Sequence, residues 1–314
     1  MTTLMVISKT KNTGKTAITA GLIRNFIDKN ISVDKILSTE KSSDKDIEFY
    51  TKFFPEIQQT NLNSKLKKSE LLNSQTISIM EGTDDHDKNL KIAQDLDASV
   101  LLVVRYGESF QKILSQYGSR INGIVVNFMP KYRRNELSDY LEKNLKDSKI
   151  EFYGFIPDDR KLLSMSINQI AQVLNGEFIY GKEHSDRLIQ NYLIGGLVLD
   201  WGPFYFSSKN DNAVIVRGDR PDVQLSALQT HETQALFLTK GVPPVEYVSY
   251  EAEKVNKPIV LFNESTHEFT EKIEKIQLKS KFDHLEKIER VSDLINSNFD
   301  LDLLIDKLRL PLTR

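Results

Sequence analysis

The chain has 314 residues, which is enough for two domains of ordinary size. Hydrophobic residues make up 39% and charged residues 27%, and the formal net charge of -2 offers no overall basic surface for nucleic acid or an anionic membrane. The lack of cysteine excludes disulfides, thiol nucleophiles and thiolate metal sites, and the five histidines show no metal-ligand spacing.

Apolar runs and helical stretches alternate through the first half of the chain. We expect strands at residues 4–7, 34–38, 76–80, 99–104, 121–127 and 152–156. Helices are expected at residues 15–28, 44–54, 88–96, 109–117 and 135–145. Because most of these strands are uniformly apolar, the pattern predicts an α/β fold in which helices cover both faces of a parallel sheet.

A second, smaller α/β unit is predicted further along the chain. A helix at residues 167–174 lies in the joining region, and strands at 213–216, 235–238 and 258–262 alternate with helices at 223–229 and 247–255. The tail from residue 281 is predicted to form charged helices with a solvated face. We therefore expect one domain at residues 1–178 and another at 179–314 that includes this helical tail.

No apolar run approaches the ~20 residues that cross a bilayer. The first eight residues are too short and uncharged for a signal peptide. We therefore expect a cytoplasmic protein without a membrane or nucleic-acid partner.

The segment Ser8-Lys9-Thr10-Lys11-Asn12-Thr13-Gly14-Lys15-Thr16 lies between the first predicted strand and the first predicted helix, where a phosphate-binding loop is expected. Gly14 allows a tight turn, Lys15 places an ammonium near the β- and γ-phosphates, and Thr16 offers a hydroxyl to Mg²⁺. The full pattern has an earlier glycine where this chain has Lys9. A plain strand-to-helix turn with a solvated lysine is the alternative.

The loop resembles that of dethiobiotin synthetase, Gly-Thr-Asp-Thr-x-x-Gly-Lys-Thr, with Ser8 in place of the opening glycine and Thr10 in place of the aspartate. The segment 44–49, Glu81-Gly82, Asn127 and the segment 156–160 follow in an order similar to that of a narrower group. That group is the dethiobiotin-synthetase-like N-terminal region of long phosphate acetyltransferases.

In that group the region is joined to a DRTGG domain. The segment 218–225, Gly-Asp-Arg-Pro-Asp-Val-Gln-Leu, resembles the domain's signature, with Pro221 where the name has threonine. The resemblance covers essentially the whole chain. Because the acetyltransferase catalytic domain has no counterpart in these residues, we do not expect acetyl transfer by the chain itself.

The resemblance implies roles for three further residues. Glu81 would place a carboxylate near the metal, Asn127 would read the purine edge, and Lys41 would stand where dethiobiotin synthetase has Lys-Pro. Ser42 replaces that proline and Lys45 is an alternative to Lys41. The other interpretations are a solvated acidic loop around Glu81 and a strand-end turn at Asn127.

These considerations give the following candidate residues. The catalytic candidates are Lys15, Lys41 and Glu81; the nucleotide-binding candidates are Lys11, Asn12, Thr13, Gly14, Lys15, Thr16, Ala17, Asn127 and Pro157; the Mg²⁺ ligands are Thr16 and Glu81.

Asp219, Arg220 and Asp222 form a candidate site in the second domain. Alternatively, Asp219 caps the following helix and Arg220 pairs with a carboxylate.

The leading hypothesis is a regulatory or scaffold protein of acyl-phosphate or acyl-CoA metabolism that binds ATP or GTP with Mg²⁺. From the relatives we expect a homodimer or higher homo-oligomer, and a separate acyl-phosphate or acyl-CoA enzyme is a candidate partner. The alternative is an ATP-dependent ligase of the dethiobiotin synthetase or cobyrinate amidase-synthase type, acting through an acyl-phosphate or carbamate intermediate. A relict nucleotide fold that works only in oligomerisation is a third hypothesis.

Overall fold

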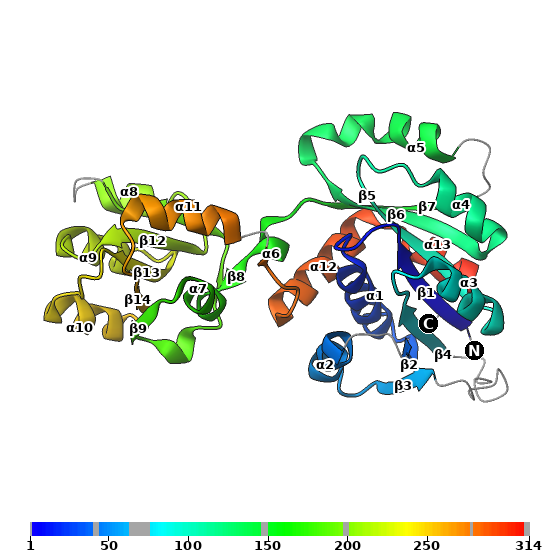
Figure 1. Ribbon diagram of the computed structural model, residues 1–314, viewed down its shortest axis with the longest axis horizontal. Helices are drawn as coiled ribbons and strands as arrows, with labels where there is room; N and C mark the ends of the chain where they lie inside the picture. The colour runs from blue at the N-terminus through cyan, green and yellow to red at the C-terminus, as the bar shows by residue number, and fades with distance from the viewer. Residues whose placement is uncertain are drawn as a thin grey trace. The chain divides into compact units, whose positions relative to one another are not determined.

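The computed structural model describes residues 2–39, 44–62, 76–145, 150–196, 201–276 and 279–310. It divides into two compact units (Figure 1). The first unit combines Met1–Asp159 with Phe282–Arg314, and the second unit is Arg160–Lys281. Among the described residues, no helix has both the length and the apolar character needed to cross a membrane.

A fully parallel seven-stranded sheet forms the centre of the first unit, in the order β3-β2-β4-β1-β5-β6-β7. Its strands are β1 (Thr2–Ser8), β2 (Ser32–Thr39), β3 (Gln58–Leu62), β4 (Thr76–Glu81), β5 (Ser99–Arg105), β6 (Ile121–Met129) and β7 (Glu151–Pro157). The central strands are buried almost throughout, as expected of a sheet covered on both faces.

Helices cover both faces of this sheet (Figure 1). They are α1 (Lys15–Asp28), α2 (Asp44–Phe53), α3 (His86–Asp95), α4 (Gln111–Tyr117), α5 (Leu137–Leu145), α12 (Leu285–Asn298) and α13 (Leu301–Leu308), with short 3-10 turns at Gly118–Arg120 and Lys131–Glu136. Helices α3, α4 and α5 share one hydrophobic core with the sheet, whereas α12 lies beside α1. The predicted α/β architecture of this unit is confirmed.

The second unit contains a smaller mixed sheet in the order β11-β12-β13-β14-β9. Strands β11 (Asn191–Ile194), β12 (Asn212–Arg217), β13 (Thr233–Thr239) and β14 (Ile259–Leu261) are parallel, and β9 (Glu177–Tyr180) is antiparallel to β14. A two-stranded ladder joins β8 (Met165–Ser166) to β10 (Leu188–Ile189).

The helices of the second unit are α6 (Arg160–Leu163), α7 (Ile167–Leu174), α8 (Gly202–Phe206), α9 (Pro221–Gln229), α10 (Glu246–Lys254) and α11 (Thr266–Ile276), with a 3-10 turn at Lys182–His184. Helices α7 and α11 pack on one face of the sheet, around Phe237, Phe262 and Phe269. Helices α8, α9 and α10 pack on the other face. The sequence pattern missed β3, β8, β9, β10, β11, α6, α8 and α11, and each of these strands has only two to five residues.

The C-terminal tail packs in the first unit, which differs from the expected division at residue 178. The buried side chains Val291 and Ile295 of α12 face Gly21 of α1, where an added Cβ would lie 2.7 Å from Ile295 Cδ1. Asn25 also donates its amide to Ser292 Oγ at 2.9 Å. The charged tail therefore has a buried apolar stripe, and the helical pattern could not indicate which sheet the stripe would cover.

Lys287 lies on α12 and is fully buried. Burial lowers the pKa of its ammonium to about 8, against a smaller opposing effect of Asp283. Between pH 8 and 10.5 the folded protein therefore holds fewer protons than the unfolded chain, so its free energy of unfolding should rise with pH, by at most about 1.4 kcal/mol per pH unit.

We expect Lys287→Met to flatten this rise in urea unfolding measured across that pH range. Lys143→Met on the exposed surface of α5 is the matched control and should retain it. Lys257 in the second unit has a pKa lowered in the same way, so a shallower rise should persist in the variant. Equal slopes for Lys287→Met and the native protein would contradict the assignment.

Candidate functional site

The loop between β1 and α1 turns sharply at Gly14, whose φ of 89° lies in the left-handed region. An added Cβ at this position would lie 2.3 Å from the amide nitrogen of Asn127, so glycine satisfies both the conformation and the close approach. Within the loop, Ser8 Oγ and Thr13 Oγ1 each donate to the carbonyl of Thr10 at 2.8 Å. These hydrogen bonds between residues of the loop stabilise its conformation.

Lys15 begins α1, and its side chain is only 15% exposed. Its ammonium donates to the carbonyl of Gly82 at 2.8 Å and lies 3.9 Å from Asp84 Oδ1. The exposed Lys11 pairs with the other oxygen of Asp84 at 3.1 Å. Two cations of the loop therefore converge on one carboxylate beyond the end of β4, in the position that a phosphate group would suit.

Thr16 and Glu81 lie in contact, although 65 residues separate them in the chain. Thr16 Oγ1 donates to Glu81 Oε2 at 3.1 Å, and the hydroxyl of Tyr50 on α2 donates to Glu81 Oε1. Parallel pairing of β1 with β4 produces this contact, because Val6 and Glu81 are register partners. A hydroxyl beside a carboxylate is the oxygen chemistry that Mg²⁺ prefers. In the described part of the chain, no group of three His, Cys, Asp or Glu side chains could hold a metal ion.

Asn127 is 6% exposed and anchors the loop from β6. Its Nδ2 donates to the carbonyl of Thr13 at 2.8 Å, and its Oδ1 accepts from the backbone N–H of Phe128 at 2.9 Å. Phe128 has a φ of 54°, and the guanidinium of Arg105 lies 4.4 Å from the centre of its ring. Through these contacts Asn127 positions the loop, and the purine-reading role that the resemblance implies stays a prediction.

The remaining nucleotide-binding and catalytic candidates of the first domain lie at the loop, at the start of α1 and at the end of β7, or outside the described residues. Asn12 is an exposed loop residue with a φ of 57°, and Ala17 lies in the first turn of α1. Pro157 ends β7 and is the register partner of Met129 in β6. Lys41 lies outside the described residues. The sequence pattern did not single out Tyr50, because nothing in an amphipathic helix shows which hydroxyl will reach a carboxylate of another element.

The signature segment of the second unit contains two local ion pairs. Arg217 donates to both oxygens of Asp219, and Arg220 donates to both oxygens of Asp222 at 3.0 and 2.8 Å. These hydrogen bonds, from Arg217 and Arg220 respectively, lower the pKa values of the two carboxyls. No side chain caps α9, so the alternative in which Asp219 caps this helix is wrong, whereas the alternative in which Arg220 pairs with a carboxylate is confirmed. Arg217, which the sequence interpretation missed, precedes Asp219 by two residues.

Gly218 begins the turn after β12, and an added Cβ would lie 1.9 Å from the carbonyl oxygen of Val242. The buried amide of Gln224 donates to the carbonyls of Arg217 and Gly218 at 2.9 and 3.0 Å. Much of the signature therefore maintains the turn between β12 and α9.

Comparison with known proteins supports this description of the second unit. Residues 169–276 match the family model of the DRTGG domain, and these residues lie within the second unit. The expected DRTGG domain is thus confirmed for this part of the chain.

Most of the chain is similar to phosphate acetyltransferases. It is 24% identical to that of Synechocystis sp. over 213 residues, which are 62% of this chain and 30% of the relative. It is 23% identical to that of Nitratidesulfovibrio vulgaris over 270 residues, which are 76% of this chain and 38% of the relative. The chain therefore spans about a third of the length of these relatives. The resemblance of the first unit to dethiobiotin synthetase stays a prediction.

One solved structure contains the CBS and DRTGG domains of the regulatory region of Clostridium perfringens pyrophosphatase, complexed with its activator diadenosine tetraphosphate. It is 14% identical, covers 36% of this chain and 49% of its own, and has a TM-score of 0.32.

Proposed function

We propose that this chain is a nucleotide-binding regulatory protein, and that the loop of residues 8–16 takes ATP or GTP together with Mg²⁺. The convergence of Lys15, Thr16 and Glu81 around a loop that needs Gly14 carries the proposal. The DRTGG domain and the similarity to phosphate acetyltransferases support a regulatory role beside an acyl-phosphate or acyl-CoA enzyme.

The residues fit a magnesium–nucleotide ligand in three respects. The backbone N–H groups at the start of α1 and the Lys15 ammonium would bind phosphate oxygens. Thr16 would contribute its hydroxyl to Mg²⁺, and Glu81 would contribute its carboxylate directly or through water. Mg²⁺ would neutralise charge on the phosphates, while Asn127 would keep the loop in shape by holding the carbonyl of Thr13.

Isothermal titration of the full chain with ATP and with GTP, each with and without Mg²⁺, tests the proposal. We expect Mg²⁺-dependent binding of at least one of the two nucleotides. Absence of binding by the native protein under all four conditions would overturn the proposal and would favour a relict fold that serves oligomerisation.

Asp84 should compete with the nucleotide, because it accepts the charges of Lys11 and Lys15 that a phosphate would need. We expect Asp84→Asn to tighten nucleotide binding by about 1.4- to fivefold, the range that exposed ion pairs of ~0.2–1 kcal/mol imply. Asp87→Asn on α3 is the matched control and should leave affinity unchanged. Weaker binding by Asp84→Asn would instead assign this carboxylate to the metal.

The same residues also support a second candidate function, an ATP-dependent ligase. The Thr16–Glu81 contact and Lys15 would stabilise a transferring phosphoryl group electrostatically. ADP release with a panel of carboxylic acids and amines tests this alternative, and lack of release across the panel would leave the regulatory function.

A further inference from the structure

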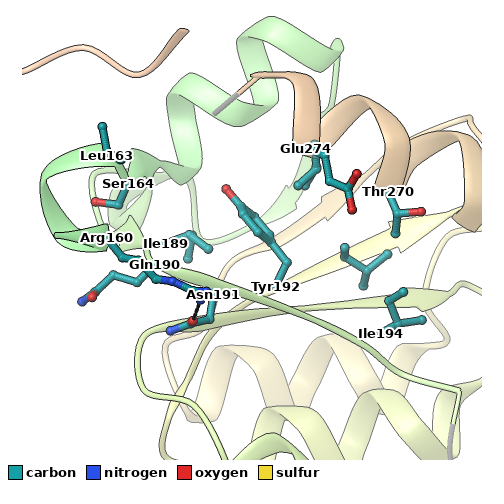
Figure 2. Close-up of a pocket in the computed structure, with 12 residues that line it drawn as sticks. Arg160, Leu163, Ser164, Ile189, Gln190, Asn191, Tyr192, Ile194, Thr270 and Glu274 are labelled. Atoms are coloured by element: carbon teal, nitrogen blue, oxygen red, sulfur yellow. Dashed lines mark hydrogen bonds between the residues drawn. The ribbon is translucent and has the colours of Figure 1, made fainter. Parts of the chain in front are cut away.

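A cavity of about 340 Å³ lies in the second unit, on the α11 side of the five-stranded sheet (Figure 2). It adjoins β11, the edge strand of that sheet, and its wall continues through β10, α6 and α11. Further into the same layer, Phe237, Phe262 and Phe269 fill the space with ring contacts. The cavity therefore lies where the aromatic core gives way to the edge of the sheet.

The floor of the cavity is apolar because successive side chains of a strand point to opposite faces of the sheet, and those on the cavity side are mostly apolar. Tyr192 and Ile194 project to the cavity side of β11, whereas Leu193 between them belongs to the core on the opposite face. Ile215 of β12 and Ile273 of α11 extend this floor. Ile194 is 47% exposed, so an apolar side chain lies in contact with solvent here.

Two unpaired charges lie in the cavity lining. Arg160 donates from Nη1 to Asn191 Oδ1 at 2.9 Å, and in the described part of the chain it pairs with no carboxylate. Glu274 has neither a hydrogen bond nor an ion pair with any described residue. The two lie on different elements, with Tyr192 between them in the view of Figure 2. This contrasts with the signature segment, where each arginine has its own aspartate.

Tyr192 adds a polar group above the apolar floor. Its ring rises from β11 and its hydroxyl points away from the sheet (Figure 2). The phenol oxygen has no hydrogen-bond partner among the residues that the structure describes. The phenol is protonated at neutral pH and can donate a hydrogen bond, and burial raises the pKa of Tyr192 further above its ordinary value.

We propose that this cavity is a binding site for a small amphipathic zwitterion, whose acidic group binds Arg160, whose apolar body covers Tyr192 and the isoleucines, and whose amino group binds Glu274. The planar guanidinium suits a carboxylate or a phosphate monoester, and Asn191 fixes one of its nitrogens. Glu274 favours a cationic far end and disfavours a second anion. The volume is in the range of small-molecule sites, which begin at about 300 Å³.

Saturation-transfer NMR titrations of the full chain with three matched probes test the proposal. The probes are 4-(aminomethyl)benzoate, benzoate, which lacks the amine, and benzylamine, which lacks the acid. We expect the zwitterion to bind with a low-millimolar Kd, as suits its size, and each of the other two to bind several-fold more weakly. Phenyl phosphate compared with benzoate distinguishes a phosphate from a carboxylate preference at Arg160.

Two variants locate the binding. Arg160→Gln should weaken 4-(aminomethyl)benzoate by about tenfold, the effect of one charge-assisted contact. Glu274→Gln should remove the preference for the zwitterion over benzoate. Lys254→Gln on α10, which packs on the opposite face of the sheet, is the control and should change neither result. Far-UV circular dichroism should show that all three variants are folded.

Absence of binding by all of the probes would overturn the proposal. Equal affinities for the zwitterion and benzoate in the native protein, or binding that Arg160→Gln leaves unchanged, would also overturn it. None of these results bears on the nucleotide site, since the cavity and the loop of residues 8–16 lie in different units.

Discussion

Replacement of Lys15 by alanine is expected to weaken the binding of Mg-ATP or Mg-GTP by about 10- to 100-fold. Hydrogen bonds to charged groups contribute roughly 1.5–3 kcal/mol each, and tenfold in affinity corresponds to about 1.4 kcal/mol. Lys15 is well placed for this effect, because its mostly buried side chain crosses to the carbonyl of Gly82 and keeps the ammonium at the start of α1. Isothermal titration measures the change directly.

Lys9→Ala is the matched control for that experiment. Lys9 belongs to the same loop and is also a lysine, but its ammonium donates to the carbonyl of Ser109 at 2.8 Å. We expect this variant to bind nucleotide with an affinity within about threefold of the native value, as loss of an exposed charge allows. Equal losses in both variants would mean that general positive charge, and not the position of Lys15, governs binding.

Replacement of Ile295 by alanine is expected to lower the free energy of unfolding by about 2–5 kcal/mol. Ile295 is fully buried between α12 and α1, with its Cδ1 directly over Gly21. Truncation leaves a cavity at this contact, and a glycine has no side chain with which to fill it. Urea unfolding followed by far-UV circular dichroism measures the loss.

Ser297→Ala on the same helix is the control. Ser297 is exposed, and its hydroxyl donates only to the carbonyl of Asp293 within α12. We expect a change within about 0.5 kcal/mol. A similarly small change for Ile295→Ala would show that the tail contributes little to the stability of the first unit.

Much of the first unit could be predicted from the sequence because its signals are local. The uniformly apolar strands of the first half predicted a parallel sheet, and the helix from Lys15 to Asp28 begins and ends as expected. The proximity of Thr16 and Glu81 followed from a general rule, since carboxyl ends of parallel strands lie along one edge. The contribution of Tyr50 depends on how α2 packs, which no local pattern specifies.

In the second unit, the functional candidates could not be predicted from local sequence patterns. Its signature segment was singled out by its resemblance to the DRTGG domain, and the charged side chains proposed there as a site pair with neighbours two residues away. The cavity beside β11 was not predicted, because Arg160, Tyr192 and Glu274 are separated in the chain and share no common motif. Short strands such as β11, which has four residues, are too short to show a clear alternation of apolar and polar side chains.

The sequence by itself determined the alternation of strands and helices, the phosphate-loop pattern ending in Gly14-Lys15-Thr16 and the presence of a DRTGG-like segment, because each is encoded by neighbouring residues. Only the tertiary structure decided that the C-terminal helices return to the first unit, and that Asn127 holds the carbonyl of Thr13. Both depend on contacts between residues more than 100 positions apart, and such contacts follow from shape complementarity and burial, which a local sequence pattern does not contain.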